Sequence, residues 1–179
     1  MKKRKRKVKT VSKKANPKTY KKSKKKIQWK TLAACLIIVY AVAFIGSFFT
    51  SQNTNSEWYK EIRPSITPPN YVFPIVWNIL FFLIALSLYF SWTNSNEKQK
   101  TKIAWVFGIN FLLNIFWSFL YFGIKQPGFA FLELIVLWFS IVAMISLTSK
   151  ISKKASWLLV PYLLWVSFAA ILNYMSAFP

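Results

Sequence analysis

Residues 58–77 read WYKEIRPSITPPNYVFPIVW, and no other part of the chain combines aromatic, proline and charged residues so densely. Proline fixes φ and removes a backbone N–H donor, so a segment with four prolines is expected to be ordered and extended. The segment leads directly into a long uncharged run that begins near Tyr71. We therefore expect residues 51–70 to form a rigid, extended cap at the edge of an apolar domain.

The rest of the chain indicates an all-α integral membrane protein. Of its 179 residues, 55% are hydrophobic and only 16% are charged, against about a quarter in soluble domains. A helix needs about 20 apolar residues to cross a bilayer. Because backbone groups in lipid must pair within the chain, we predict a five-helix bundle (residues 31–179). The predicted helices span about 31–50, 71–92, 103–124, 128–149 and 155–177. The first helix is favoured over a cleaved signal peptide because no small-residue cleavage site follows it.

The charge is concentrated at the start of the chain. Residues 1–30 hold 16 of the 25 Lys and Arg residues and no acid. Residues 2–30 lack apolar periodicity, so we expect a disordered cytoplasmic tail that contacts anionic lipid headgroups. Nucleic acid is the less favoured partner, because no aromatic residues are interleaved with the charges. The short links at 93–102 and 150–154 are also basic. This pattern places the tail on the cytoplasmic side of a cell membrane, and loop 51–70 and the C-terminus on the outer side.

Several classes of metal and cofactor chemistry are excluded by composition. The chain has no His and a single Cys, Cys35, so it offers no Cys/His zinc site, no His-ligated haem and no internal disulfide. We expect no metal and no resident cofactor. Cys35 lies in an apolar run and is expected to be buried. No conventional catalytic set is present either, so any chemistry would depend on the ligand.

Polar and aromatic residues recur on single faces of three predicted helices. Spacings of three and four residues place them on one side of a helix. Amides and indoles inside a membrane seek partners, so these faces should point into the bundle. Two interpretations of these faces remain open. The faces either pack against neighbouring helices or line a pocket for a large, planar, apolar ligand. These residues are Trp77 and Phe81; Asn110, Asn114 and Trp117; and Trp165, Ala169 and Asn173.

Glu133 is the only acidic residue within a predicted membrane helix. An ionisable residue at such a position is a candidate functional group. It also follows Pro127 and Gly128 closely, so a position near the interface at a helix N-terminus is an equally good explanation. The sequence leaves these two interpretations open.

Three motifs resemble those of the TspO/MBR family, the tryptophan-rich sensory proteins and translocator proteins. The first resembles the family pattern W-Y…K-P-S-W-x-P-P…V-W. The second and third resemble L-N-x-x-W-S…F-F-G and P-Y-L-x-W-x-x-F-A-x-x-L-N. In this chain they are Trp58-Tyr59, Arg63-Pro64-Ser65, Thr67-Pro68-Pro69 and Val76-Trp77; Leu113-Asn114, Trp117-Ser118 and Phe122-Gly123; and Pro161-Tyr162-Leu163, Trp165, Phe168-Ala169 and Leu172-Asn173.

The resemblance implies a homodimeric membrane receptor or sensor whose pocket binds protoporphyrin IX or a similar tetrapyrrole. It implies that loop 51–70 is a lid, hereafter the lid loop. The implied pocket residues are Tyr59, Trp77, Phe81, Asn114, Trp117, Trp165 and Ala169, and the implied lid residues are Trp58, Pro64, Pro68 and Pro69. Light- and oxygen-dependent porphyrin breakdown, with Trp77 and Trp165 as candidate catalytic residues, is the first alternative. Transport is the second.

Two departures from the family pattern affect these implications. Ile66 and Tyr71 stand where many members carry Trp, which is expected to alter contacts of the lid or photochemistry. No basic residue follows Tyr174, so the pattern that accompanies steroid recognition in animal members is incomplete.

Overall fold

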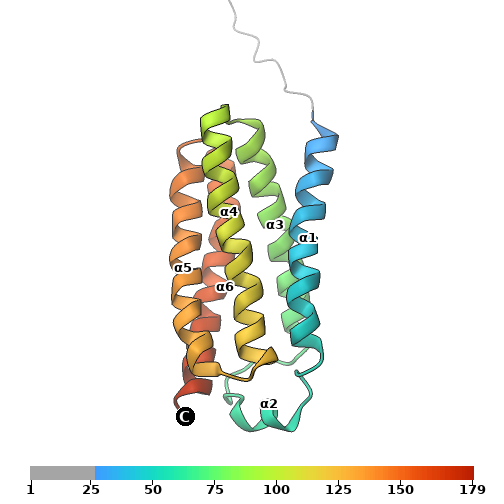
Figure 1. Ribbon diagram of the computed structural model, residues 1–179, viewed down its shortest axis with the longest axis vertical. Helices are drawn as coiled ribbons and strands as arrows, with labels where there is room; N and C mark the ends of the chain where they lie inside the picture. Colours follow the sequence, from blue (N-terminus) through green and yellow to red (C-terminus); the bar gives the residue numbers. More distant parts are fainter. Residues whose placement is uncertain (1–26) are drawn as a thin grey trace, which may run out of the picture.

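The computed structural model describes residues 27–179, and within them it is entirely helical (Figure 1). Most of the predicted tail, residues 2–26, lies outside the described residues. Five helices are long and apolar enough to cross a membrane. The elements are α1 (Trp29–Ser51), α2 (Glu57–Ile62), α3 (Val72–Thr93), α4 (Glu97–Ser118), the π-helical turn η1 (Phe119–Gly123), α5 (Pro127–Ser149) and α6 (Lys153–Ala177).

The long helices form a closed ring that does not follow chain order. Going round the bundle, α1 contacts α3, α3 contacts α6, α6 contacts α5, α5 contacts α4, and α4 returns to α1. Figure 1 shows α2 and the C-terminus at one end of the bundle, with the start of α1 at the other. The lid loop therefore covers one mouth of the ring.

The lid loop corrects the expectation of a wholly extended cap. Glu57–Ile62 form the short helix α2, because the Ser56 hydroxyl caps its N-terminus by accepting from the Tyr59 N–H at 3.3 Å. The prolines begin only after this helix, where Arg63 turns to an extended conformation with ψ 121°. The prediction of extended backbone is thus wrong for α2.

The other helix ends lie within two residues of the predicted ones, so that α1 begins at Trp29 inside the predicted tail, and only α4 differs by more. Helix α4 begins at Glu97, before the predicted residue 103, because Asn96 and Gln99 form a reciprocal capping box with both bonds at 2.9 Å. The charged residues 97–102, which suggested a connection between helices, form the first turns of this helix. At its other end the helix loosens into η1, where the Ile124 N–H bonds to the Phe119 carbonyl.

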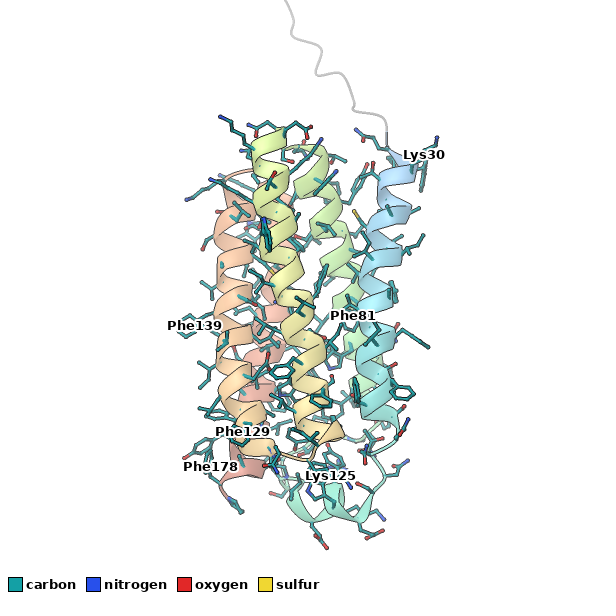
Figure 2. The ribbon with its side chains drawn as sticks, viewed as in Figure 1. Lys30, Phe81, Lys125, Phe129, Phe139 and Phe178 are labelled. Atoms are coloured by element: carbon teal, nitrogen blue, oxygen red, sulfur yellow. The ribbon has the colours of Figure 1, made fainter. Side chains whose placement is uncertain are left out.

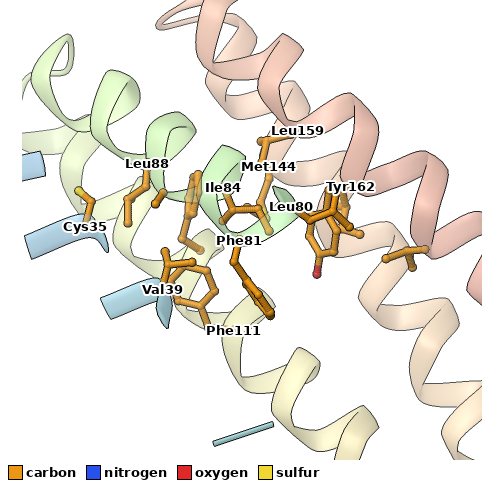
Figure 3. Packing of buried hydrophobic residues seen from close by; sticks show 14 of the residues in the cluster. Cys35, Val39, Leu80, Phe81, Ile84, Leu88, Phe111, Met144, Leu159 and Tyr162 are labelled. Atoms are coloured by element: carbon orange, nitrogen blue, oxygen red, sulfur yellow. The ribbon is translucent and has the colours of Figure 1, made fainter. Parts of the chain in front are cut away.

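The larger of two clusters of buried hydrophobic side chains extends into the half of the bundle away from the lid loop. Val39, Ile84, Met144 and Leu159 are each at most 1% exposed and belong to one cluster (Figure 3). Cys35 is buried in the same cluster, as expected. Large apolar side chains such as Phe139, 62% exposed, instead point outward from the bundle (Figure 2). A surface of this kind is suited to lipid, and the protein is a multi-pass membrane protein.

This difference between buried and lipid-facing side chains predicts a large effect for one truncation and a small effect for another. Ile84→Ala should destabilise the protein by about 2 to 5 kcal/mol, since it leaves a cavity in the core. Phe139→Ala should change stability by less than about 0.5 kcal/mol, because lipid or detergent fills the vacated space. Unfolding in mixed micelles, followed by circular dichroism, measures both. A cost for Phe139→Ala equal to that of Ile84→Ala would contradict an outward, lipid-facing position.

Candidate functional site

A cavity of about 410 Å³ lies beneath the lid loop, within the range of about 300 to 1,000 Å³ typical of small-molecule sites. Its wall is built from α1, α3, α4 with η1, and α6, and α2 and the segment after it complete the cover. Helix α5 contributes no residue to this wall. This cavity therefore lies at the lid end of the ring.

All seven predicted pocket residues lie on the wall of this one cavity. Tyr59 comes from the lid loop, and the others come from three different membrane helices. Their common location fits a pocket, while their role in binding a ligand stays a prediction. The seven are Tyr59, Trp77, Phe81, Asn114, Trp117, Trp165 and Ala169.

The aromatic part of the wall is held by ring contacts. Trp77 packs against Phe81 with ring centroids 5.3 Å apart, and Trp165 meets Phe73 edge-on at 5.8 Å. Trp117 stacks on Tyr121 at 5.3 Å. Offset and edge-to-face pairs of this kind are favourable beyond their buried area. They fix the planes of the indoles that face the cavity.

The amides that suggested polar contacts to a ligand also bond to the protein. The Asn114 side chain donates to the Tyr162 hydroxyl at 3.2 Å, and that hydroxyl donates to Asn110 Oδ1 at 3.4 Å. Asn110 in turn donates to Ser140 Oγ on α5 at 2.8 Å. Asn114 lines the cavity and also ties α4 to α6, so its position is compatible with both interpretations left open by the sequence. Asn110 belongs to packing alone, because it is not on the wall.

A second polar chain joins three elements next to the cavity. Trp117 Nε1 donates to Asn173 Oδ1 at 3.0 Å, and Asn173 Nδ2 donates to the Pro127 carbonyl at 2.8 Å. Beside it, the Tyr121 hydroxyl donates to Ser176 Oγ at 2.9 Å. The large flat side chains of α4 and η1 are thus tied to α6 by their polar ends.

The predicted lid residues have different positions. Pro64 lines the cavity. Trp58 packs against Tyr121 at 5.9 Å, and the Lys125 ammonium lies 5.7 Å from its ring centroid. The carbonyls of Pro68 and Pro69 accept hydrogen bonds from Arg63 and from the Val72 N–H. Trp58 therefore anchors the cover, and these two carbonyls stabilise its fold.

Tyr59 seats α2 on the bundle. Its side chain is 7% exposed and its ring lies 5.6 Å from that of Phe122 in η1. Burial raises the pKa of the Tyr59 phenol above its ordinary value, and the positive charge of Arg63 opposes this in part. The phenol is therefore neutral at physiological pH, and the cavity wall contains no charged side chain.

Helix α1 contributes a part of the wall that was not predicted from the sequence. Ala43, Gly46, Ser47 and Thr50 line the cavity from that helix. Their spacing of three, one and three residues places small side chains on one face, and this was the available signal. Small residues let the cavity extend up to the α1 backbone.

Three residues singled out in the sequence lie off the wall. Ile66 and Tyr71 are 53% and 67% exposed, so their departure from Trp does not change the wall of the cavity. Glu133 is buried in α5, and neither of its carboxyl oxygens has a hydrogen-bond partner among residues 27–179. The same described residues contain no group of three or more metal-ligating His, Cys, Asp or Glu side chains.

The fold and the cavity define a five-helix membrane protein with a capped aromatic pocket. Comparison with known proteins then identifies the family: residues 34–178 match the TspO/MBR family, and the chain belongs to it. It is 38% identical to the tryptophan-rich protein TspO of Chlorobaculum tepidum over 145 residues, covering 80% of this chain and 92% of the relative. It is 38% identical over 147 residues to the tryptophan-rich protein TspO of Archaeoglobus fulgidus, with the same two coverages. It is 30% identical to the translocator protein of Ovis aries over 135 residues, which cover 72% of this chain and 80% of the relative.

The Asn173 tie gives a stability prediction. Asn173→Ala leaves the Trp117 N–H and the Pro127 carbonyl without their partners, so it should destabilise the protein by about 2 kcal/mol. Tyr174→Phe is the matched control, since Tyr174 is 52% exposed and its ring contacts survive the change. Thermal unfolding in detergent measures both. Equal melting temperatures for Asn173→Ala and wild type would show that these hydrogen bonds do not hold the site together.

Proposed function

We propose that this protein is a membrane receptor that binds a planar, metal-free tetrapyrrole, such as protoporphyrin IX, in the cavity beneath the lid loop. The observation that carries the proposal is the wall itself: indole and phenyl rings from α3, α4 and α6 surround an uncharged space. Flat π faces favour stacking with a flat macrocycle. The absence of His from the whole chain fits a ligand that brings no metal to be coordinated.

A photochemical role is the second candidate. Trp77 and Trp165, the two candidate catalytic residues, both lie on the wall, and Trp165 Nε1 has no hydrogen-bond partner among the described residues. An indole in this position could give an electron to a photoexcited porphyrin, which then reduces oxygen to superoxide. The indole radical cation recovers its electron from the macrocycle, and the oxidised macrocycle combines with superoxide to give an oxygenated product. Transport has less support, because Glu133, the one buried acid, is not on the wall.

Titration with protoporphyrin IX, followed by quenching of tryptophan fluorescence, tests the receptor proposal. We expect saturable binding by wild type and at least a tenfold loss for Ala169→Phe, because the new ring fills space on the wall. Trp77→Phe combined with Trp165→Phe should also weaken binding. Trp105→Phe is the control, since Trp105 is 69% exposed on α4 and should behave as wild type. Unsaturable binding by wild type would overturn the proposal.

We further propose that the end of the bundle opposite the lid loop faces the cytoplasm and, with the tail, contacts anionic lipid. Lys30 marks this end in Figure 2, and Lys125 lies at the other, beside α2. The α3–α4 and α5–α6 connections lie on the Lys30 side (Figure 1). Among the described residues, basic side chains gather there, which supports the inside orientation. They are Lys30, Lys98, Lys100, Lys102, Lys150, Lys153 and Lys154.

Cysteine labelling in intact cells tests this orientation. With Cys35 replaced by Ala, a cysteine introduced at Ser65 should react with a membrane-impermeant maleimide. A cysteine introduced at Lys98 should react only after the membrane is opened. Both positions are exposed in the structure, so access to the reagent depends on the side of the membrane. The reverse labelling pattern would invert the topology.

A further inference from the structure

The lid loop is organised around one guanidinium group. Arg63 Nη2 donates to the Thr67 carbonyl at 3.2 Å and to the Pro68 carbonyl at 2.7 Å. Its Nη1 donates to Asn70 Oδ1 at 3.1 Å. A planar group with several donors in fixed directions can make all three bonds at once. Arg63 therefore sets the conformation of residues 67–70.

Thr67 and Asn70 are the two residues of this segment that line the cavity. The Asn70 side chain is occupied: it accepts from Arg63 and donates to the Thr54 carbonyl at 3.4 Å and to Asn55 Oδ1 at 3.3 Å. Thr67 differs, because its Oγ1 is buried and has no hydrogen-bond partner among the described residues. A buried hydroxyl without a partner is costly. A ligand that supplies an acceptor removes that cost.

Two neighbouring hydroxyls on α1, those of Ser47 and Thr50, do not offer the same contact. Ser47 Oγ donates to the Phe44 carbonyl at 2.8 Å, and Thr50 Oγ1 donates to the Gly46 carbonyl at 3.2 Å. Both protons are therefore used within α1. Thr67 and Trp165 are the cavity-lining residues with a buried side-chain donor that lacks a partner in the described part of the chain. Of the two, Thr67 belongs to the cover.

We propose that Thr67 is a specificity-determining residue of the pocket: its hydroxyl donates a hydrogen bond to an oxygen at the polar edge of the ligand, and Arg63 is the positioning residue that holds it there. The inference rests on the proposed function and adds an orientation to it. The oxygen-bearing edge of the macrocycle lies under the cover, while its apolar part extends past Trp77 toward Phe81, further along α3 from the lid loop.

Two porphyrins that differ in this edge provide the test. Protoporphyrin IX carries two carboxyl groups, whereas octaethylporphyrin has the same flat ring and no oxygen. Thr67→Val keeps the side-chain shape and removes the hydroxyl. It should weaken protoporphyrin IX binding about five- to tenfold and leave octaethylporphyrin binding unchanged. Thr67→Ser should restore protoporphyrin IX affinity, and Ser65→Ala, an exposed change in the same loop, should match wild type for both probes.

Arg63→Lys tests the positioning role, because an ammonium group cannot make the three forked bonds. We expect it to weaken protoporphyrin IX binding in the wild-type background and to add little in the Thr67→Val background. Full additivity of the two changes would overturn the positioning role. Equal losses for both porphyrins in Thr67→Val would show a purely structural residue and overturn the specificity role. If wild type binds neither porphyrin, the proposed function fails and this inference fails with it.

Discussion

The hydrogen-bonded tie between α4 and α6 is the constraint on which the rest of the structure depends. Polar groups within a membrane bundle must find partners inside the protein, and Asn173 uses both ends of its amide to do so. One end accepts from Trp117 and the other donates to the first residue of α5. The indole therefore has a fixed position on the wall. Without this tie, rings of this size would be free to turn inward and fill the space that they now enclose.

The conformation of the cover over this space depends on a shortage of backbone hydrogen-bond donors. Prolines at 64, 68 and 69 have no N–H, so the segment that contains them has more carbonyl acceptors than donors. Arginine has five donors and no acceptor, and Arg63 meets the carbonyls of Thr67 and Pro68 directly. The stiffness expected from the prolines thus arises from two sources. Proline restricts the backbone angles, and the guanidinium supplies the missing hydrogen bonds.

The sequence predicted the parts of this arrangement that depend on local periodicity. The five membrane helices and the inward faces of Trp117 and Trp165 follow from apolar length and from spacings near 3.6 residues. Helix α2 was missed because its six residues are too few for a periodic pattern; the Ser56 hydroxyl caps it, and Tyr59 packs it against Phe122, more than sixty residues away in the chain. The α1 wall was missed because that helix shows no polar face, and the face formed by Ala43, Gly46, Ser47 and Thr50 differs from the others in side-chain size. The start of α4 was missed because its charged first turns resemble a link until the capping box is seen.

The uneven packing along the bundle suits a receptor for a bulky ligand. Buried positions on α3 begin at Leu80, and the turns of that helix nearest the lid loop contain none. On α1 the largest fully buried side chain is Val39, in the half away from the lid loop. On these two helices the fully buried side chains therefore lie away from the mouth of the cavity. Regions with few buried contacts open at lower free energy than a packed core. The lid end can then rearrange to admit a large planar molecule while the packed half keeps the five helices in register.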